Sequence, residues 1–110
     1  MLAIIAPGQG AQTPGMLAPW IEDAESKALL IQWSDAIALD LVHLGVHADA
    51  DEIKDTANAQ PLIVAAGLLS ARALELSEKF SYVAGHSVGE ITAAAIAGVL
   101  TPLDAMKLVR

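Results

Sequence analysis

The segment 85–89 reads Gly-His-Ser-Val-Gly, and this Gly-x-Ser-x-Gly pattern constrains the fold more than any other part of the chain. The residues before it, 80–83, are rich in β-formers, and the residues after it, 90–97, are strong helix formers. This order is typical of a nucleophile elbow, a sharp strand-to-helix turn that exposes a serine hydroxyl at the start of a helix. The sequence therefore predicts a strand, a tight turn at Ser87 and a helix.

A second short strand is expected near the amino terminus. Residues 2–6 are continuously apolar and stop at Pro7-Gly8, the pattern of a buried parallel strand that feeds a tight loop. Residues 81–84 are expected to form the strand that leads to Ser87. Helical periodicity lies between the two strands, so the sequence predicts an α/β fold with a parallel sheet.

The helical segments differ in character. Residues 24–44 predict one or two amphipathic helices, and the acidic residues 49–55 predict a short helix or turn with a solvated face. Residues 56–77 are apolar nearly all round, which predicts a central, buried helix with Pro61 where a first turn tolerates proline. The helix after Ser87 should end at Gly98.

A last helix is expected to open at Thr101-Pro102, with a capping hydroxyl, a proline and the acid Asp104 in the first turn. No stop signal follows before Arg110, so we expect a chain cut in mid-helix. Two strands also make too small a sheet for a stable core. Residues 1–110 are thus expected to be the amino-terminal portion of one domain in a larger α/β enzyme.

Composition excludes several function classes. Hydrophobic residues make up 55% of 110 residues, which predicts an oligomer or a part of something larger. The net charge of −7 argues against nucleic acid as a partner. The chain has no cysteine, and its three histidines fall in no metal-ligand pattern. There is no secretory signal and no membrane span, so we expect a soluble, cytoplasmic protein.

A serine nucleophile needs a general base and oxyanion donors about 3 Å from the developing charge. The N–H of Val88, the residue after the serine, is one such donor in an elbow. The second must come from another loop. The loop 7–12, Pro-Gly-Gln-Gly-Ala-Gln, is the natural candidate because it leaves the carboxyl end of the first strand, the edge where open α/β sheets bind ligands.

Three motifs together resemble the malonyl-CoA:acyl carrier protein transacylase family. They are Pro-Gly-Gln-Gly-Ala-Gln at 7–12, Ala-Gln-Pro at 59–61 and Gly-His-Ser-Val-Gly-Glu at 85–90, in the family's order and approximate spacing. The resemblance implies an α/β-hydrolase-like acyltransferase core. It also implies that Ser87 takes a malonyl group from malonyl-CoA as an ester and passes it to the phosphopantetheine thiol of acyl carrier protein, in fatty acid biosynthesis, with no bound cofactor.

The resemblance also assigns residues. It implies that Gln9 and Val88 supply the backbone donors of the oxyanion hole, and that Gln60 and His86 line the acyl site. The family's catalytic histidine lies downstream of Arg110, so His86 is not the base. The arginine that grips the malonyl carboxylate is expected two positions after Arg110, and that role is not transferred to Arg110. The branched apolar Val88 after the serine favours malonyl over methylmalonyl units.

Two other functions stay open at this point. A serine esterase or patatin-like lipase would share the elbow and would hydrolyse its ester. Alternatively, the 110-residue chain is inactive by itself and acts only as a binding module, because a nucleophile without its base loses most of its rate.

Overall fold

The computed structural model describes residues 3–74 and 82–110. Two short strands, β1 (Ala3–Ala6) and β2 (Tyr82–Gly85), pair in parallel with Ala6 opposite Gly85. The predicted α/β fold with parallel strands is confirmed. Leu2 and Ser81, which were expected to begin the two strands, lie outside the described residues. The helical elements are η1 (Trp20–Glu22), α1 (Ala24–Ile37), η2 (His43–His47), α2 (Ala50–Lys54), α3 (Thr56–Leu74), α4 (Gly89–Ile96) and α5 (Pro102–Val109).

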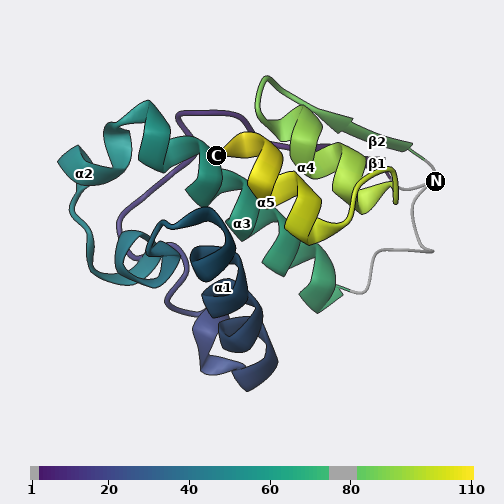
Figure 1. Cartoon of the computed structure of the whole chain (residues 1–110). Coiled ribbons are helices and arrows are strands. Elements are labelled where there is room, and N and C mark those ends of the chain that lie inside the picture. The colour runs from purple at the N-terminus through teal and green to yellow at the C-terminus, as the bar shows by residue number, and fades with distance from the viewer. Residues whose placement is uncertain (1–2, 75–81) are drawn as a thin grey trace.

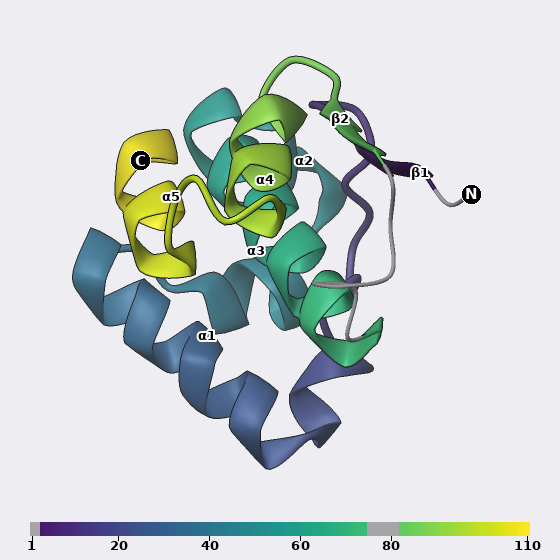
Figure 2. The same cartoon turned by 90° about the vertical axis from the view of Figure 1, so that its right-hand side faces the viewer.

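The sheet lies at one edge of the molecule, and the helices are stacked to one side of it (Figure 1). Helix α4 contacts both strands, and it also contacts α3 and α5. Helix α1 contacts α5 and lies far from the strands in both views (Figures 1 and 2). Because α4 follows directly on β2, the turn that joins them lies where the sheet meets the helical layer.

The core is built mainly by helices and the loops that join them. Helix α3 is central and buried, as predicted, and its buried residues run from Ala59 to Leu69. The sheet is thinly covered, since Ile5 of β1 is 76% exposed and Tyr82 of β2 is 65% exposed. The large side chains that are fully buried include Leu17, Leu30, Leu41, Ile53, Leu62, Ile63, Leu69 and Met106.

The segment 24–44 divides into two helical pieces. Helix α1 stops at Ile37 because Ala38 adopts a left-handed conformation with φ of 54°, and its N–H donates to the carbonyl of Ser34. The Ser34 hydroxyl then accepts the N–H of Leu41 at 3.1 Å. After this turn the chain forms the short π-helical element η2. The left-handed cap is an alanine, so the sequence carried no glycine signal for it.

Pro61 lies inside α3, and its predicted place in the first turn is wrong. Asp55 starts the helix a full turn before the proline. Its carboxylate accepts the N–H of Ala57 at 2.9 Å, and its carbonyl accepts the N–H of Ala59 at 2.7 Å. Because proline has no N–H, the carbonyl of Ala57 does not receive the usual helical bond from position 61. The predicted end of this helix at residue 77 lies outside the described residues.

The remaining helix signals are confirmed. The acidic segment contains α2, whose N-cap Asp49 accepts the N–H of Glu52 at 2.9 Å. Gly98, with φ of 86°, follows α4 and donates its N–H to Ala95. The Thr101 hydroxyl accepts the N–H of Asp104 at 3.1 Å and caps α5.

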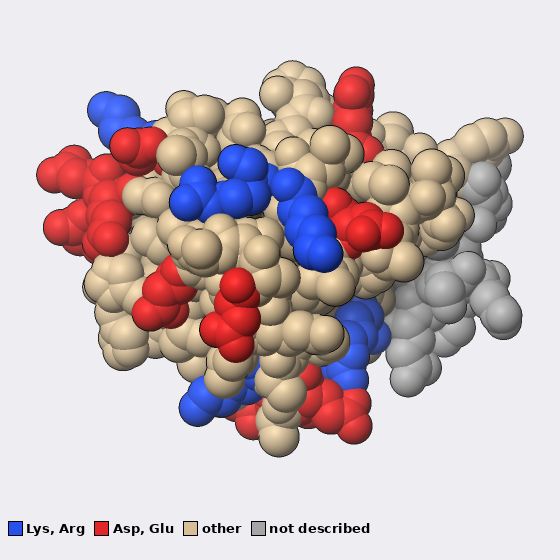
Figure 3. All heavy atoms as spheres, in the orientation of Figure 1, with Lys and Arg blue, Asp and Glu red and all other residues tan. Residues whose placement is uncertain are grey.

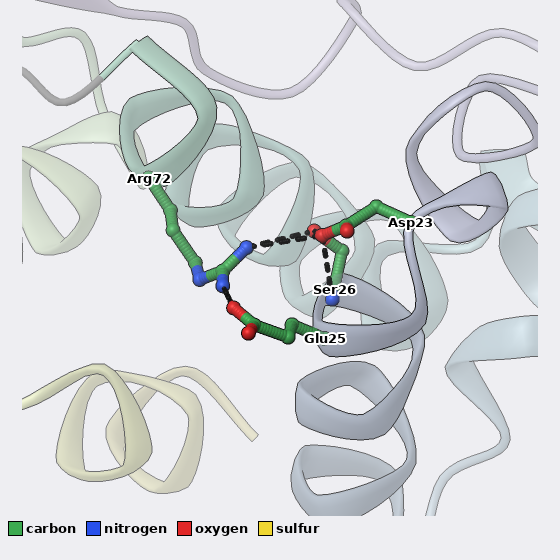
Figure 4. Close-up of polar contacts among 4 residues, drawn as sticks. All are labelled: Asp23, Glu25, Ser26 and Arg72. Carbon is green, nitrogen blue, oxygen red and sulfur yellow. Dashed lines mark hydrogen bonds and ion pairs between the residues drawn. The ribbon is translucent and has the colours of Figure 1, made fainter.

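One polar cluster ties α3 to the start of α1 (Figure 4). The guanidinium of Arg72 is 3.2 Å from both the Asp23 carboxylate and the Ser26 hydroxyl, and it also pairs with Glu25. Asp23 is the N-cap of α1 and accepts the N–H of Ser26 at 3.1 Å. These bonds hold the last described turn of α3 against the first turn of α1.

Charged side chains are unevenly spread on the face drawn in Figure 3. Acidic atoms gather at the end of the molecule where α2 lies, which matches the predicted solvated acidic face. Within residues 3–74 and 82–110, no helix combines the length and the apolar character needed to cross a membrane.

Candidate active site

Ser87 lies in the turn between β2 and α4, with its side chain exposed. Its φ is 57°, so a non-glycine residue occupies the left-handed region. Such a conformation costs on the order of 1–2 kcal/mol and persists where the surrounding structure enforces it. Glu90, in the first turn of α4, donates its N–H to the Ser87 carbonyl at 3.0 Å. The turn presents the hydroxyl at the start of α4.

The two glycines of the pattern are required by close packing. A Cβ on Gly85 would overlap the backbone of Gly89, and a Cβ on Gly89 would overlap the backbone carbonyl of Ala6 at the end of β1. Any side chain at either position would push α4 away from the strands. The glycines therefore let β1, β2 and the first turn of α4 meet at one point, beside Ser87.

The loop after β1 touches this turn. Parallel pairing brings the carboxyl ends of both strands to the same edge, and His86 extends the ladder by donating its N–H to Ala6 at 3.0 Å. Gly8 is buried there: a Cβ on it would lie 2.5 Å from the His86 carbonyl oxygen and 3.3 Å from the Ser87 Cβ. The first loop thus lies directly against the serine.

The backbone N–H groups of Gln9 and Val88, near Ser87 in the fold, have no hydrogen-bond acceptor among the described residues. Val88 is the N-cap residue of α4, so its N–H lies at the positive end of a helix. Gln9 follows Gly8 in the loop that contacts the serine. A backbone N–H without a protein partner is the kind of group that can stabilise an anion.

His86 and Gln60, both predicted to line the acyl site, lie on different elements: His86 is in the serine turn and Gln60 is on α3. The His86 side chain is exposed, and its Nδ1 lies 3.1 Å from where a Cβ on Gly8 would be. Gln60 is half-buried on α3, one helical turn after Thr56 and therefore on the same face. In the described part of the chain, no hydrogen bond links Gln60 to the serine turn.

The chain is similar to known proteins in sequence and in structure. No family model matches the chain. The chain is 54% identical, over 112 aligned positions, to the malonyl CoA-acyl carrier protein transacylase of Mycobacterium tuberculosis, and the match covers 98% of this chain and 37% of that protein. It is 38% identical to the transacylase of Bacillus subtilis, with 99% of this chain and 28% of the relative covered.

Solved structures agree with the sequence matches. The crystal structure of MCAT from Mycobacterium tuberculosis superimposes with a TM-score of 0.92 at 50% identity, covering 99% of this chain and 37% of that one. Over the part of those proteins that it spans, the chain matches malonyl CoA-acyl carrier protein transacylases in both sequence and fold. It spans a little over a third of the length of the mycobacterial transacylases, at 37%.

A further solved transacylase shares the fold. It is a malonyl-transacylase captured in complex with a type II polyketide synthase acyl-carrier protein, with a TM-score of 0.87 and 32% identity, covering 98% of this chain and 36% of that one. In this chain, the residues predicted for the site lie close together in part: the loop that carries Gln9 meets His86 and Ser87, whereas Gln60 lies on α3.

Arg110 makes a structural contact with the end of α1. Its Nε donates to the carbonyl of Ile37 at 3.0 Å, and this carbonyl belongs to the last turn of α1, where helical carbonyls lack partners.

Sequence reasoning missed Thr56. Its hydroxyl accepts a hydrogen bond from the Gln9 side-chain amide at 3.1 Å. The available signal was its place one helical turn before Gln60. Among the described residues, no cluster of three histidine, cysteine, aspartate or glutamate side chains could hold a metal ion.

Proposed function

We propose that the protein transfers a malonyl group from coenzyme A to the phosphopantetheine thiol of acyl carrier protein, through an ester on Ser87, in fatty acid biosynthesis. The observation that carries the proposal is the left-handed Ser87, held at a strand-to-helix turn beside a glycine-rich loop, in a chain 54% identical to a protein of that name. A relative captured with an acyl-carrier protein supports the choice of acceptor. We propose further that residues 1–110 are part of a single acyltransferase domain.

The proposed reaction has two halves. The Ser87 Oγ attacks the thioester carbonyl and loses its proton to a base, and the carbonyl oxygen becomes an oxyanion that the N–H groups of Gln9 and Val88 stabilise. Collapse of this intermediate breaks the carbon–sulfur bond, and the departing CoA sulfur takes up the proton. In the second half the carrier's thiol attacks the serine ester, and Ser87 recovers its hydroxyl.

The roles of the neighbouring residues follow from their places. His86 and Gln60 are proposed to line the acyl site and not to act as the base. A residue adjacent to the nucleophile diverges from it at the turn, and the His86 ring lies towards Gly8. The branched, buried Val88 is proposed to favour malonyl over bulkier units.

The test is mass spectrometry of the intact protein after mixing with malonyl-CoA. We expect a mass gain of one malonyl group on the peptide that contains Ser87, loss of the gain in Ser87→Ala, and discharge on addition of acyl carrier protein bearing its thiol. Ser70→Ala is the matched control, because that serine donates to the Ala66 carbonyl within α3.

Other results would point elsewhere. Release of malonate to water without any thiol acceptor would indicate a hydrolase. An adduct that persists in Ser87→Ala would place the nucleophile at another residue. A protein that takes up no malonyl group would favour a binding role.

A further inference from the structure

Two glutamines, Gln9 and Gln12, make the side-chain hydrogen bonds of the loop after β1, residues 7–12. The Gln12 side-chain oxygen accepts the N–H of Gly10 at 2.8 Å, and the Gly8 carbonyl accepts the N–H of Ala11 at 3.3 Å. Both bonds are internal to the loop, so they fix its shape and not its place on the molecule. Gly10, with φ of 112°, adds conformational freedom at its centre.

The Gln9 side chain makes the link to the helical layer. Its Nε2 donates to the Thr56 hydroxyl at 3.1 Å, across 47 positions of sequence. Apart from the packing of Gly8 against the serine turn, this is the polar contact that connects the loop to another element within the described residues.

Thr56 is exposed, but it belongs to a well-packed helix. It is the first residue of α3, which contacts α2, α4 and α5 and is largely buried. Asp55 fixes this end of the helix by accepting the N–H of Ala57 at 2.9 Å through its side chain. The Thr56 hydroxyl, placed on this packed helix, can therefore hold the glycine-containing loop in one position.

We propose that Thr56 is a positioning residue, which acts through the Gln9 side chain to hold the Gln9 backbone N–H at the place where the oxyanion forms. This inference rests on the proposed acyl transfer at Ser87. An oxyanion donor is most effective when it is preorganised to within about 0.5 Å, and a misplacement of about 1 Å can cost about a hundredfold in rate. The contact with Thr56 supplies that preorganisation.

The first test compares Thr56→Val, which removes the hydroxyl and keeps the branched shape, with Thr56→Ser, which keeps the hydroxyl. In single-turnover acylation of the intact protein by malonyl-CoA, we expect Thr56→Val to lower the maximal rate by about tenfold to a hundredfold. The concentration of malonyl-CoA at half-maximal rate should change little. Thr56→Ser should restore most of the rate, and Thr13→Val, on an exposed residue near the same loop, should behave as wild type.

A double-mutant comparison separates this role from general stabilisation. Gln9→Met keeps the length of the side chain and removes its amide. If Gln9 and Thr56 act through one hydrogen bond, the double variant Gln9→Met with Thr56→Val should acylate no more slowly than the worse single variant. Multiplicative losses would overturn the proposal.

Amide hydrogen exchange gives a readout that does not depend on catalysis. We expect residues 8–12 to exchange faster in Thr56→Val than in wild type or Thr56→Ser, with α3 unchanged. If wild type is not acylated, the proposed function fails and Thr56 loses its catalytic consequence, while the exchange data still decide whether it anchors the loop. Normal acylation by Thr56→Val, or unchanged exchange, overturns the inference.

Discussion

Asp23 and Arg72 meet at 3.2 Å, although 49 positions of sequence separate them. The Asp23 carboxylate also accepts the backbone N–H and the hydroxyl of Ser26, at 3.1 and 2.8 Å. These two bonds from Ser26, followed by the nearby Arg72, lower the pKa of Asp23 below its ordinary value. One carboxylate therefore both caps α1 and joins it to α3.

This arrangement predicts how stability depends on pH. Because the pKa of Asp23 is lower in the folded state, its contribution is fully present above the pKa of the unfolded chain, about 4, and is lost as pH falls through the lower folded value. Asp23→Asn keeps a capping oxygen and removes the charge. We expect urea unfolding between about pH 2 and 5 to show a shallower acid loss in Asp23→Asn than in wild type.

The control for that measurement is Asp35→Asn. Asp35 is exposed on the same helix and makes no side-chain hydrogen bond in the described part of the chain. Its substitution should leave the acid slope unchanged. Equal slopes for wild type and Asp23→Asn would contradict the assignment.

The left-handed turn at Ser87 predicts an inversion of the usual ranking of glycine and alanine. Glycine adopts a positive φ without penalty, whereas alanine carries a cost on the order of 1–2 kcal/mol. The greater freedom of glycine in the unfolded chain offsets roughly 0.5–1 kcal/mol of that difference. Ser87→Gly should therefore unfold at a higher denaturant concentration than Ser87→Ala, while both lack the hydroxyl. A more stable alanine variant would mean that the turn relaxes to negative φ.

Thr92 predicts a stabilising substitution. It is 1% exposed, and its hydroxyl is buried without a hydrogen-bond partner among the described residues. Removing an unpaired buried hydroxyl while keeping the shape should be neutral or stabilising by about 1 kcal/mol. Thr92→Val should raise the melting temperature or leave it unchanged.

Thr92→Ser is the matched variant. It keeps the hydroxyl and deletes the methyl group that packs on Gly67, where a Cβ would lie 2.6 Å from Thr92 Cγ2. We expect Thr92→Ser to destabilise the protein. A strongly destabilised Thr92→Val would show that the hydroxyl has a partner.

The outer face of the sheet predicts self-association. Ile5 and Tyr82 are 76% and 65% exposed on neighbouring strands, which leaves apolar surface open beside a sheet edge. In sedimentation velocity, the 110-residue chain should associate, and Ile5→Lys should reduce the associated fraction. Ile31→Lys, at a 44% exposed position on α1 away from the sheet, should have less effect. A monodisperse wild-type monomer would refute this expectation.

Local signals in the sequence predicted much of the fold. The Gly-x-Ser-x-Gly pattern, the Thr101 cap and Gly98 act over a few residues, so the strand, turn and helices around them could be read directly. The end of α1 at Ala38 could not, because an alanine in the left-handed region leaves no compositional trace.

The sequence predicted those parts of the candidate site that depend on local motifs and strand ends. It did not predict the contact between segments that are distant in the sequence. Ser87, Val88 and the loop of Gln9 lie at strand ends, which parallel pairing brings together. The bond from Gln9 to Thr56 depends on how α3 packs, and no spacing rule predicts it. The predicted position of Pro61 was wrong for a related reason. Proline favours the first turn of a helix, but α3 starts earlier, where the Asp55 carboxylate accepts the N–H of Ala57.

The pairing of Ala3 with Tyr82 has a kinetic consequence. Five of the seven helical elements described lie between the two strands, so pairing the strands closes a long stretch of chain and raises the contact order, which slows folding. The serine turn is complete only when that closure has occurred, because Gly89 packs against Ala6 of the first strand. The Ser87 turn therefore depends on a contact between distant parts of the chain, and the appearance of a reactive hydroxyl during refolding would time the pairing of the strands.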